Sequence, residues 1–210
     1  MKVPRRLVGV VVVILATAII PELGLATVSA PDVTQPLPNG GFESGHTDWL
    51  EFSLQGQHFL IWHANEMPVP PYGGSWAAWL GRVHDEISFV YQDLTVPEGS
   101  SVFLRYWHWI ESWDSCGYDF GYVVINDLWQ DTYDLCQATN TGEWVLHSVN
   151  ISRFAGQFVR LEIWGVTDST YGSNLYVDDV YFDFTGSPPS PIFADGFESG
   201  DTGRWAATAP

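Results

Sequence analysis

The sequence predicts an all-β fold for residues 31–185, an antiparallel β-sandwich of the jelly-roll type. Short runs rich in valine, isoleucine, tyrosine, phenylalanine and tryptophan recur through this segment, and such runs are typical of strands. No apolar run in the segment follows helical spacing convincingly. Asparagine, aspartate, glycine and proline separate the runs at regular intervals, which favours a sandwich or a jelly roll.

Each predicted strand is a run of apolar and aromatic residues that stops at turn-forming residues. The clearest turn signals are Pro70-Pro71, Pro97-Glu98-Gly99 and Asn140-Thr141-Gly142. In chain order, the predicted strands are 49–54, 58–63, 75–80, 87–96, 102–110, 119–126, 128–133, 144–149, 158–166 and 175–184.

The charge balance excludes whole classes of partner. The chain has 210 residues, the length of one domain with tails, and carries 8 Lys+Arg against 25 Asp+Glu, a net charge of −17. Such a surface repels phosphate backbones and anionic lipids, which argues against nucleic acid and membrane surfaces as partners. Aromatic residues make up 15% of the chain, more ring surface than an acidic disordered chain would carry, so the chain is expected to fold.

The first thirty residues are typical of a secretory signal peptide. A basic start with Lys2, Arg5 and Arg6 precedes the apolar run 7–20, and residues 28–30 supply small side chains before a cleavage point. An uncleaved transmembrane anchor is the alternative, but the run is short for a bilayer span of about 20 residues. The mature chain is therefore expected to be secreted, either free outside the cell or associated with its surface.

The last 25 residues hold a linker and a tail. Residues 186–191 have the proline- and serine-rich composition of a stiff linker. The tail at 192–210 repeats, at 196–200, the Gly-Phe-Glu-Ser-Gly sequence of residues 41–45, and it resembles the short C-terminal tails of secreted bacterial proteins. A sorting or processing signal and the remnant of a repeat both fit this tail.

The two cysteines, Cys116 and Cys136, are expected to pair. In an exported chain, two cysteines most often form a disulfide, and their spacing is not C-x-x-C. Two free thiols or a redox pair are the alternatives. A disulfide closing a loop of this length contributes about 3 kcal/mol in the chain-entropy account.

An ordered set of motifs lies between residues 38 and 184. The motifs are Asn39-Gly40-Gly41-Phe42-Glu43 with Trp49, Gly74-Ser75-Trp76-Ala77-Ala78-Trp79-Leu80-Gly81, Leu94-Thr95-Val96-Pro97, Leu104-Arg105-Tyr106-Trp107, residues 154–161, and Leu175-Tyr176-Val177-Asp178-Asp179-Val180. In this order they resemble the galactose-binding-like jelly-roll modules found beside secreted bacterial hydrolases. The family includes carbohydrate-binding modules and the accessory domain of immune-inhibitor-A-type metalloproteases. The resemblance implies the fold but no particular ligand, because such modules share a scaffold while their binding surfaces differ.

The same resemblance implies a structural Ca²⁺ where the first and last strands meet. It gives ligand roles to the Glu43 side chain, the Gly41 carbonyl and Asp178, with Asp179 as the neighbour that can substitute. Hard cations prefer such oxygen ligands, and one ion could clamp two distant parts of the chain. The alternative is that Glu43 caps a turn and Asp178 accepts hydrogen bonds from backbone amides.

Two strands are expected to present an aromatic binding face. In the strand 102–110, the period of two puts Arg105, Trp107 and Trp109 on one side. The corresponding residues of the strand 158–166 are Arg160, Glu162 and Trp164. If the opposite residues fill the core, these rings can stack on sugars while the charged groups bind hydroxyls, and clustered exposed rings mark interaction sites. The alternative is that other rings or a loop cover this face and make the tryptophans part of the core.

The function expected from these features is that of a non-catalytic extracellular module that binds carbohydrate or a cell-surface polymer. No nucleophile-elbow, phosphate-loop or dinucleotide motif occurs in the sequence. A structural or adhesion domain for secreted or cell-surface protein partners is the alternative. A glycan-active enzyme on a jelly-roll scaffold is a lesser one, because it would need only two well-placed carboxylates.

Overall fold

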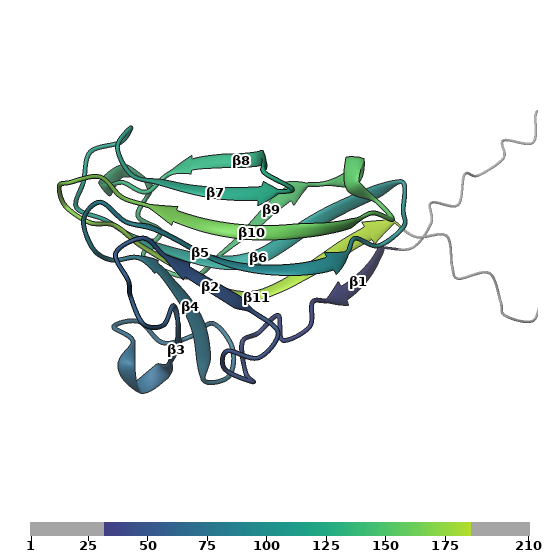
Figure 1. Ribbon diagram of the computed structural model, residues 1–210, viewed down its shortest axis with the longest axis horizontal. Helices are drawn as coiled ribbons and strands as arrows, with labels where there is room; N and C mark the ends of the chain where they lie inside the picture. Colours follow the sequence, from purple (N-terminus) through teal and green to yellow (C-terminus); the bar gives the residue numbers. More distant parts are fainter. Residues whose placement is uncertain (1–31, 186–210) are drawn as a thin grey trace, which may run out of the picture.

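A computed structural model of the chain describes residues 32–185, which form two antiparallel sheets packed face to face (Figure 1). The fold is an all-β jelly-roll sandwich, which confirms the predicted fold class. The predicted signal peptide (1–30), linker (186–191) and tail (192–210) lie outside the described residues. No helix within residues 32–185 is long and apolar enough to cross a membrane.

The larger sheet has six strands and the smaller has five. The larger follows the order β3-β4-β11-β6-β9, with β1 also paired to β11, and the smaller follows β2-β5-β10-β7-β8. The larger sheet consists of β1 (Asp32–Pro36), β3 (Ile61–His63), β4 (Trp76–Gly81), β6 (Ser101–Glu111), β9 (Val145–Asn150) and β11 (Asn174–Thr185). The smaller consists of β2 (Leu50–Ser53), β5 (Ile87–Thr95), β7 (Phe120–Ile125), β8 (Leu128–Asp134) and β10 (Phe158–Val166).

All ten predicted strands are present, and one further strand was not predicted. β1 has the sequence Asp-Val-Thr-Gln-Pro, which is polar and ends in proline, so it lacks the apolar run by which strands are recognised. It is tolerated as a strand because it lies along an edge and pairs with β11 alone, from Asp32 opposite Thr185 to Pro36 opposite Tyr181. The predicted strand 58–63 is shorter than expected, and only Ile61–His63 of it pairs.

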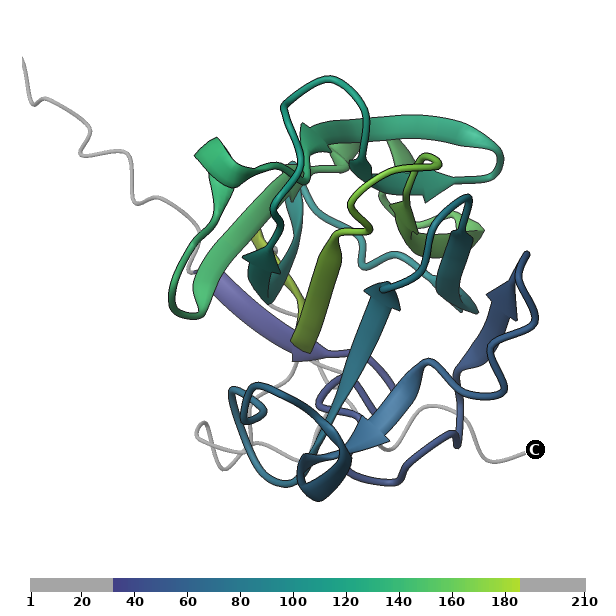
Figure 2. The same cartoon turned by 90° about the vertical axis from the view of Figure 1, so that its left-hand side faces the viewer.

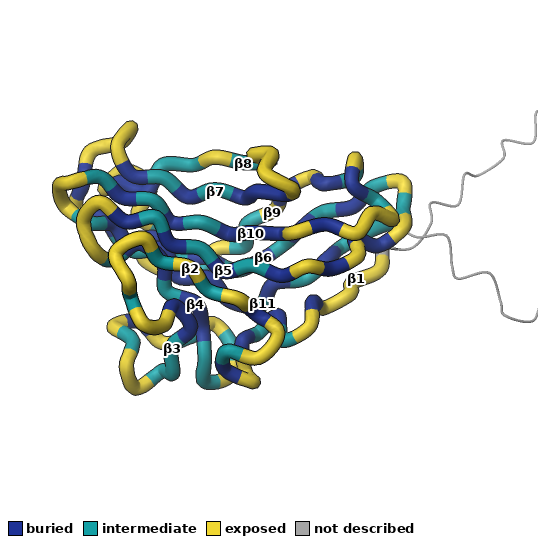
Figure 3. Tube along the Cα trace, in the orientation of Figure 1, coloured by how far each residue is buried: buried dark blue, intermediate teal, exposed yellow. Residues whose placement is uncertain are grey.

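Side-chain alternation builds a single core between the sheets. Along β6, alternate residues from Val102 to Ile110 are buried while those between them are half-buried, and along β10 Val159, Leu161 and Ile163 are buried. The tube in Figure 3 is coloured by burial; β6 alternates along its whole length, whereas β10 has three consecutive buried residues at 161–163. The predicted inward and outward sets of both strands are therefore correct.

β4 and β1 share one edge of β11, one after the other. β4 pairs with β11 from Asn174 to Val177, and β1 pairs with it from Tyr181 to Thr185. β6 pairs along the whole opposite edge, with a register shift between Asp178 and Tyr181. In the gap between β4 and β1, the backbone of Gly40 accepts a hydrogen bond from the Val180 amide at 2.9 Å. The register shift is a β-bulge, and it places Asp178 and Asp179 next to the chain segment that follows β1.

A cluster of histidines and tyrosines interrupts the apolar core between β6, β8 and β9. His108 lies with its ring centroid 4.9 Å from that of His147 and 5.5 Å from that of Tyr133. The Tyr106 and Tyr133 hydroxyls are 3.2 Å apart, and His147 Nε2 lies 2.6 Å from a carboxylate oxygen of Asp131. Burial, followed by the positive charge that His147 can carry, lowers the pKa of His108 to about 4.

The lowered pKa of His108 predicts that stability falls as the pH drops from about 6.5 to about 4. Over that range the unfolded chain binds a proton at this residue and the folded chain does not, so acid favours unfolding by up to about 3 kcal/mol. Urea unfolding across this pH range measures the effect. The variant His108→Gln should show a shallower slope than the wild type, whatever its absolute stability. An unchanged slope would contradict the assignment, since Asp131, His147 and the two tyrosines remain in the variant.

Candidate functional site

The six residues predicted to form one binding face lie on two opposite faces of the sandwich. Trp107 and Trp109 point outward from β6 in the larger sheet, whereas Trp164 points outward from β10 in the smaller sheet. Both strands turn their alternate residues into the same core. The prediction of a single platform was therefore wrong, because the period of two reveals which residues leave the core but not to which sheet a strand belongs.

On the smaller sheet, the rings mostly cover one another. Phe52, Phe89 and Trp164 form a row across β2, β5 and β10, with ring centroids 4.8 and 4.6 Å apart and interplanar angles of 23° and 12°. Rings stacked in this way turn their faces toward each other and their edges toward water. The row therefore leaves few flat ring faces for a ligand.

The charged residues predicted on the smaller sheet are paired within the protein. Glu162 is buried and accepts a hydrogen bond from Trp164 Nε1 at 2.7 Å. Arg160 forms two hydrogen bonds to Asp93, at 2.9 and 3.1 Å, and its guanidinium lies 4.7 Å from the centre of the Tyr91 ring. Contacts within the protein therefore hold both charged side chains in place on this face.

On the larger sheet, Trp109 belongs to a closely packed row of rings. Trp109 pairs with Tyr176 of β11, and Tyr176 pairs on its other side with Trp79 of β4. The Trp79 and Tyr176 rings stack with centroids 5.4 Å apart, and the Arg82 guanidinium covers Trp79 at 4.0 Å. Tyr176 is fully buried although it lies on the outer side of the sheet. For Trp109, the alternative given by the sequence therefore holds: the aromatic rings pack against one another and cover this part of the sheet.

Trp107 differs from Trp109 because it lines a hollow. One side of its indole stacks on the Tyr72 ring, with centroids 4.0 Å apart and an interplanar angle of 14°. Trp144 supports Tyr72 edge-on, and its Nε1 donates a hydrogen bond to the Pro70 carbonyl at 3.0 Å. Trp107 also borders a pocket of about 360 Å³. The other residues that line the pocket are Thr34, Pro36, Gly40, Gly41, Asp179, Val180 and Tyr181.

This pocket has the chemistry of a small-ligand site. Its volume lies in the range that small-molecule sites occupy, and it combines an aromatic wall with a few polar groups. Asp179 supplies a carboxylate and Thr34 a hydroxyl. Burial, and then the negative charge of Glu43, raise the pKa of Asp179. Apolar ring surface and hydrogen-bonding groups therefore meet in one hollow.

Arg105 lies on the same strand as Trp107, but it lines a separate pocket of about 140 Å³ and not the one beside Trp107. It stands opposite Tyr181 of β11, and its Nη2 forms an ion pair with Asp183 at 2.8 Å. Its buried Nε has no hydrogen-bond partner among the described residues. Of the three charged residues predicted to bind a ligand, Arg105 is the one that lies on the same face as Trp107.

The residues predicted to bind Ca²⁺ meet around the loop before β4. Glu43 accepts hydrogen bonds from the Ser75 amide at 2.8 Å and the Trp76 amide at 3.0 Å. Asp178 accepts one from the Gly73 amide at 3.0 Å, and burial raises its pKa to about 7. The sequence left open, as an alternative to Ca²⁺ binding, that Glu43 and Asp178 accept hydrogen bonds from backbone amides. These hydrogen bonds are present.

The same quartet also fits a hard cation in its donor chemistry. An Asp179 carboxylate oxygen lies 2.9 Å from the position that a Cβ would take on Gly41, and the other lies 3.3 Å from the corresponding position on Gly73. None of the three carboxylates, those of Glu43, Asp178 and Asp179, forms an ion pair with a cationic side chain within residues 32–185. Ca²⁺ binding by these residues stays a prediction.

A different acidic cluster has the tighter geometry. Within the described part of the chain, one group of three or more potential metal ligands has its ligand atoms all within 4.8 Å of one another, and it consists of Asp114, Asp119 and Asp168. This cluster could hold a metal ion. Sequence analysis missed it because its members come from two loops far apart in the chain, and no spacing rule connects them.

The predicted disulfide between Cys116 and Cys136 is present. It joins the loop that follows β6 to the segment that follows β8, close to the acidic cluster.

No protein-family model matches the chain, and no curated protein matches its sequence. Solved structures do match in fold. The carbohydrate-binding module TmCBM61, solved in complex with β-1,4-galactotriose, has a TM-score of 0.52 and 15% identity over 70% of this chain and 95% of its own. A cyclase from Fischerella sp. TAU has a TM-score of 0.50 and 12% identity over 75% of this chain and 100% of its own. A cleaved adhesin domain of Lys-gingipain from Porphyromonas gingivalis has a TM-score of 0.47 and 13% identity, over 72% of this chain and 99% of its own.

These similarities are confined to the fold. They confirm the predicted resemblance to carbohydrate-binding modules at the level of the sandwich. The predicted resemblance to the metalloprotease accessory domain stays a prediction. Because the fold is shared by a binding module and a cyclase, it does not by itself assign a function.

The contact between Gly74 and Glu43 predicts an unusually costly glycine substitution. Gly74 has a φ of +58°, and a Cβ there would lie 2.2 Å from the Glu43 carboxyl carbon. Gly56 has a φ of +73° with nothing within 4 Å of its Cβ position, so Gly56→Ala should cost only the backbone strain of about 1–2 kcal/mol. Gly74→Ala should cost about 1–3 kcal/mol more, because Glu43 must move.

Thermal or urea unfolding of both alanine variants tests this. In a Glu43→Ala background, Gly74→Ala should cost only about as much as Gly56→Ala, because the clash disappears. Equal losses in the two glycine variants, or an undiminished cost of Gly74→Ala in the Glu43→Ala background, would show that Glu43 does not pack against this turn.

Proposed function

We propose that this chain is a non-catalytic extracellular module that binds carbohydrate in the pocket beside Trp107. The proposal rests on the surroundings of the Trp107 ring. Tyr72 holds one part of the indole in place, while another part lines a pocket of about 360 Å³ that contains the Asp179 carboxylate. A fixed ring can stack on the apolar face of a sugar without losing further side-chain freedom on binding.

Besides stacking on a ring, sugar recognition requires hydrogen bonds to the hydroxyls, and polar groups of the pocket can supply them. Asp179 can accept hydrogen bonds from hydroxyls, and the Thr34 hydroxyl can donate or accept one. TmCBM61, which shares the sandwich fold, binds β-1,4-galactotriose in its solved complex. Galactose-containing oligosaccharides are therefore the first class of ligand to test here.

The proposal includes Ca²⁺ as a structural ion at Gly41, Glu43, Asp178 and Asp179. An ion held there would adjoin the pocket, because Gly41 and Asp179 also line it. When bound, it would offset the mutual repulsion of the three carboxylates. The Cys116–Cys136 disulfide supports an extracellular location, because disulfides persist in oxidising compartments.

Two other functions remain as competing proposals. Protein adhesion is favoured by exposed apolar residues on the smaller sheet and near its edge, among which Trp129 and Phe158 are 66% and 71% exposed. A glycan-active enzyme would need a pair of carboxylates in a cleft. The pocket beside Trp107 is lined by one carboxylate, that of Asp179, which favours binding over hydrolysis.

Glycan binding by Trp107 variants tests the proposal. The full chain is screened against β-1,4-galactan and other soluble and insoluble polysaccharides in the presence of Ca²⁺. We expect Trp107→Ala to weaken binding at least about tenfold, since it removes the ring on which the sugar stacks, and Tyr72→Ala to weaken it less. Trp164→Ala serves as the matched control, because it removes an equivalent half-buried indole from the opposite face.

The outcomes separate the three functions. Loss of binding in Trp107→Ala and its retention in Trp164→Ala, with both variants folded by circular dichroism, would support the pocket. If Trp107→Ala does not fold, Asp179→Asn takes its place in the same comparison. Binding that depends on Trp164 instead would move the site to the smaller sheet. No binding to any glycan would favour protein adhesion, and cleavage of a polysaccharide would favour an enzyme.

A further inference from the structure

Three aspartates converge at the end of the sandwich opposite to Asp32 and Thr185. Asp114 lies in the loop that follows β6, Asp119 immediately precedes β7, and Asp168 lies in the loop between β10 and β11. This end of the molecule faces the viewer in Figure 2. The cluster is thus separate from the pocket beside Trp107 and from the residues around Glu43.

Two of the three carboxylates are removed from water without a compensating charge. Asp114 is 5% exposed and Asp119 is fully buried. None of the ion pairs within residues 32–185 includes any of the three aspartates. The four arginines of this region are engaged elsewhere: Arg105 with Asp183, Arg160 with Asp93, Arg82 with Trp62 and Trp79, and Arg153 with Phe154. Burying carboxylates together without a cation is costly.

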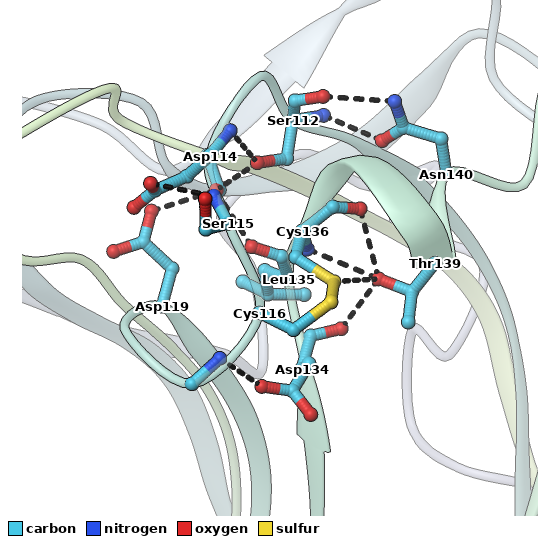
Figure 4. The surroundings of a disulfide bond; sticks show 12 residues. Ser112, Asp114, Ser115, Cys116, Asp119, Asp134, Leu135, Cys136, Thr139 and Asn140 are labelled. Atoms are coloured by element: carbon cyan, nitrogen blue, oxygen red, sulfur yellow. Dashed lines mark hydrogen bonds between the residues drawn. A yellow bond between two sulfur atoms is a disulfide. The ribbon is translucent and has the colours of Figure 1, made fainter.

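Hydrogen bonds satisfy only part of the cluster. Asp119 accepts from the Asp168 amide at 2.7 Å and from the Ser173 hydroxyl at 2.6 Å. One Asp114 oxygen accepts from the Ser115 amide at 2.7 Å. The other, Asp114 Oδ2, is buried and has no hydrogen-bond partner among residues 32–185. Figure 4 shows the carboxylates of Asp114 and Asp119 side by side near the disulfide. An unpartnered, buried carboxylate oxygen in an uncompensated acidic cluster requires either a cation or a proton to neutralise it.

We propose that Asp114, Asp119 and Asp168 bind a Ca²⁺ ion. Calcium lies about 2.3–2.6 Å from its oxygen ligands, so oxygens that share one ion lie at most about 5.2 Å apart. The three ligand atoms here lie within 4.8 Å of one another. The group contains neither cysteine nor histidine, which favours a hard oxygen-binding cation over zinc or copper.

The ion would connect the two loops that supply its ligands, the β6–β7 loop and the β10–β11 loop. The Asp168 carbonyl accepts a hydrogen bond from the Asp85 amide at 2.7 Å, which links the β10–β11 loop to the β4–β5 loop. The Asp114 carbonyl accepts one from the Gln137 amide at 2.8 Å, next to the Cys116–Cys136 disulfide. A cation held by the three side chains would therefore stabilise loops that the disulfide ties together only in part.

Protons are the alternative way to neutralise the cluster. Burial raises the pKa of Asp119, and the charges of Asp114 and Asp168 raise it further. A protonated cluster would respond to pH and not to Ca²⁺. The two explanations therefore separate when Ca²⁺ is added and removed at one fixed pH.

Hydrogen exchange of the full chain, with Ca²⁺ and with a chelator at neutral pH, tests the calcium site. We expect Ca²⁺ to slow exchange at least about tenfold in residues 112–119 and 167–173. Asp168→Asn should abolish this local slowing, because it removes one ligand charge while keeping the oxygen that accepts from the Thr170 amide. Asp168 is only half-buried, so the variant is expected to fold, and Asp114→Asn serves as the second variant.

Two controls keep this site distinct from the other predicted ion site. Asp127→Asn changes the charge equally at an exposed position and should leave the Ca²⁺ effect intact. Asp179→Asn alters the quartet around Gly41 and should also leave the slowing at 112–119 and 167–173 intact. No Ca²⁺ effect in these segments of the wild type, an equal effect in Asp168→Asn, or its loss in Asp179→Asn would each overturn the proposal.

Discussion

The pairing of β11 with three other strands is the constraint on which the rest of the structure depends. One edge of β11 pairs with β6, and the other pairs first with β4 and then with β1. Because two strands share one edge, a gap opens between them, and there the Gly40 carbonyl accepts a hydrogen bond from Val180, beside the bulge at Asp178 and Asp179. Asp179 thereby reaches the turn at Gly41, and the pocket beside Trp107 forms at the same point. Topology, more than any local motif, creates the candidate site.

Most of the fold could be predicted from the sequence, since sandwich strands are recognisable by alternation. The inward residues of β6 and β10 follow the period of two, and they are buried as expected. β1 escaped prediction because its pairing with β11, and not an apolar run, makes it a strand. The placement of β6 and β10 in different sheets also escaped prediction, because alternation contains no information about which strands are neighbours. That is why Trp107 and Trp164 were wrongly assigned to one surface.

One candidate ion site could be found from local sequence motifs, whereas the other depends on long-range contacts. The motifs around Glu43 and Asp178 pointed correctly to two chain segments that meet, although the structure gives their oxygens backbone amides as partners. The Asp114, Asp119 and Asp168 cluster could not be found in the sequence, since only folding brings its loops together. Solvation costs explain why such clusters matter: a chain with 25 acidic residues can leave most of them in water, so those that it buries without arginine partners require a specific explanation.

The most direct test of carbohydrate binding beside Trp107 is an NMR titration of the tryptophan indole N–H signals with a β-1,4-galactan oligosaccharide. Assignment by single Trp→Phe variants distinguishes Trp107 on the larger sheet from Trp164 on the smaller one. If sugar binds in the pocket beside Trp107, the Trp107 signal shifts progressively to saturation while the Trp164 signal stays in place, because the two rings point from opposite faces of the sandwich. A saturating shift of Trp164 with none at Trp107 would contradict binding in this pocket.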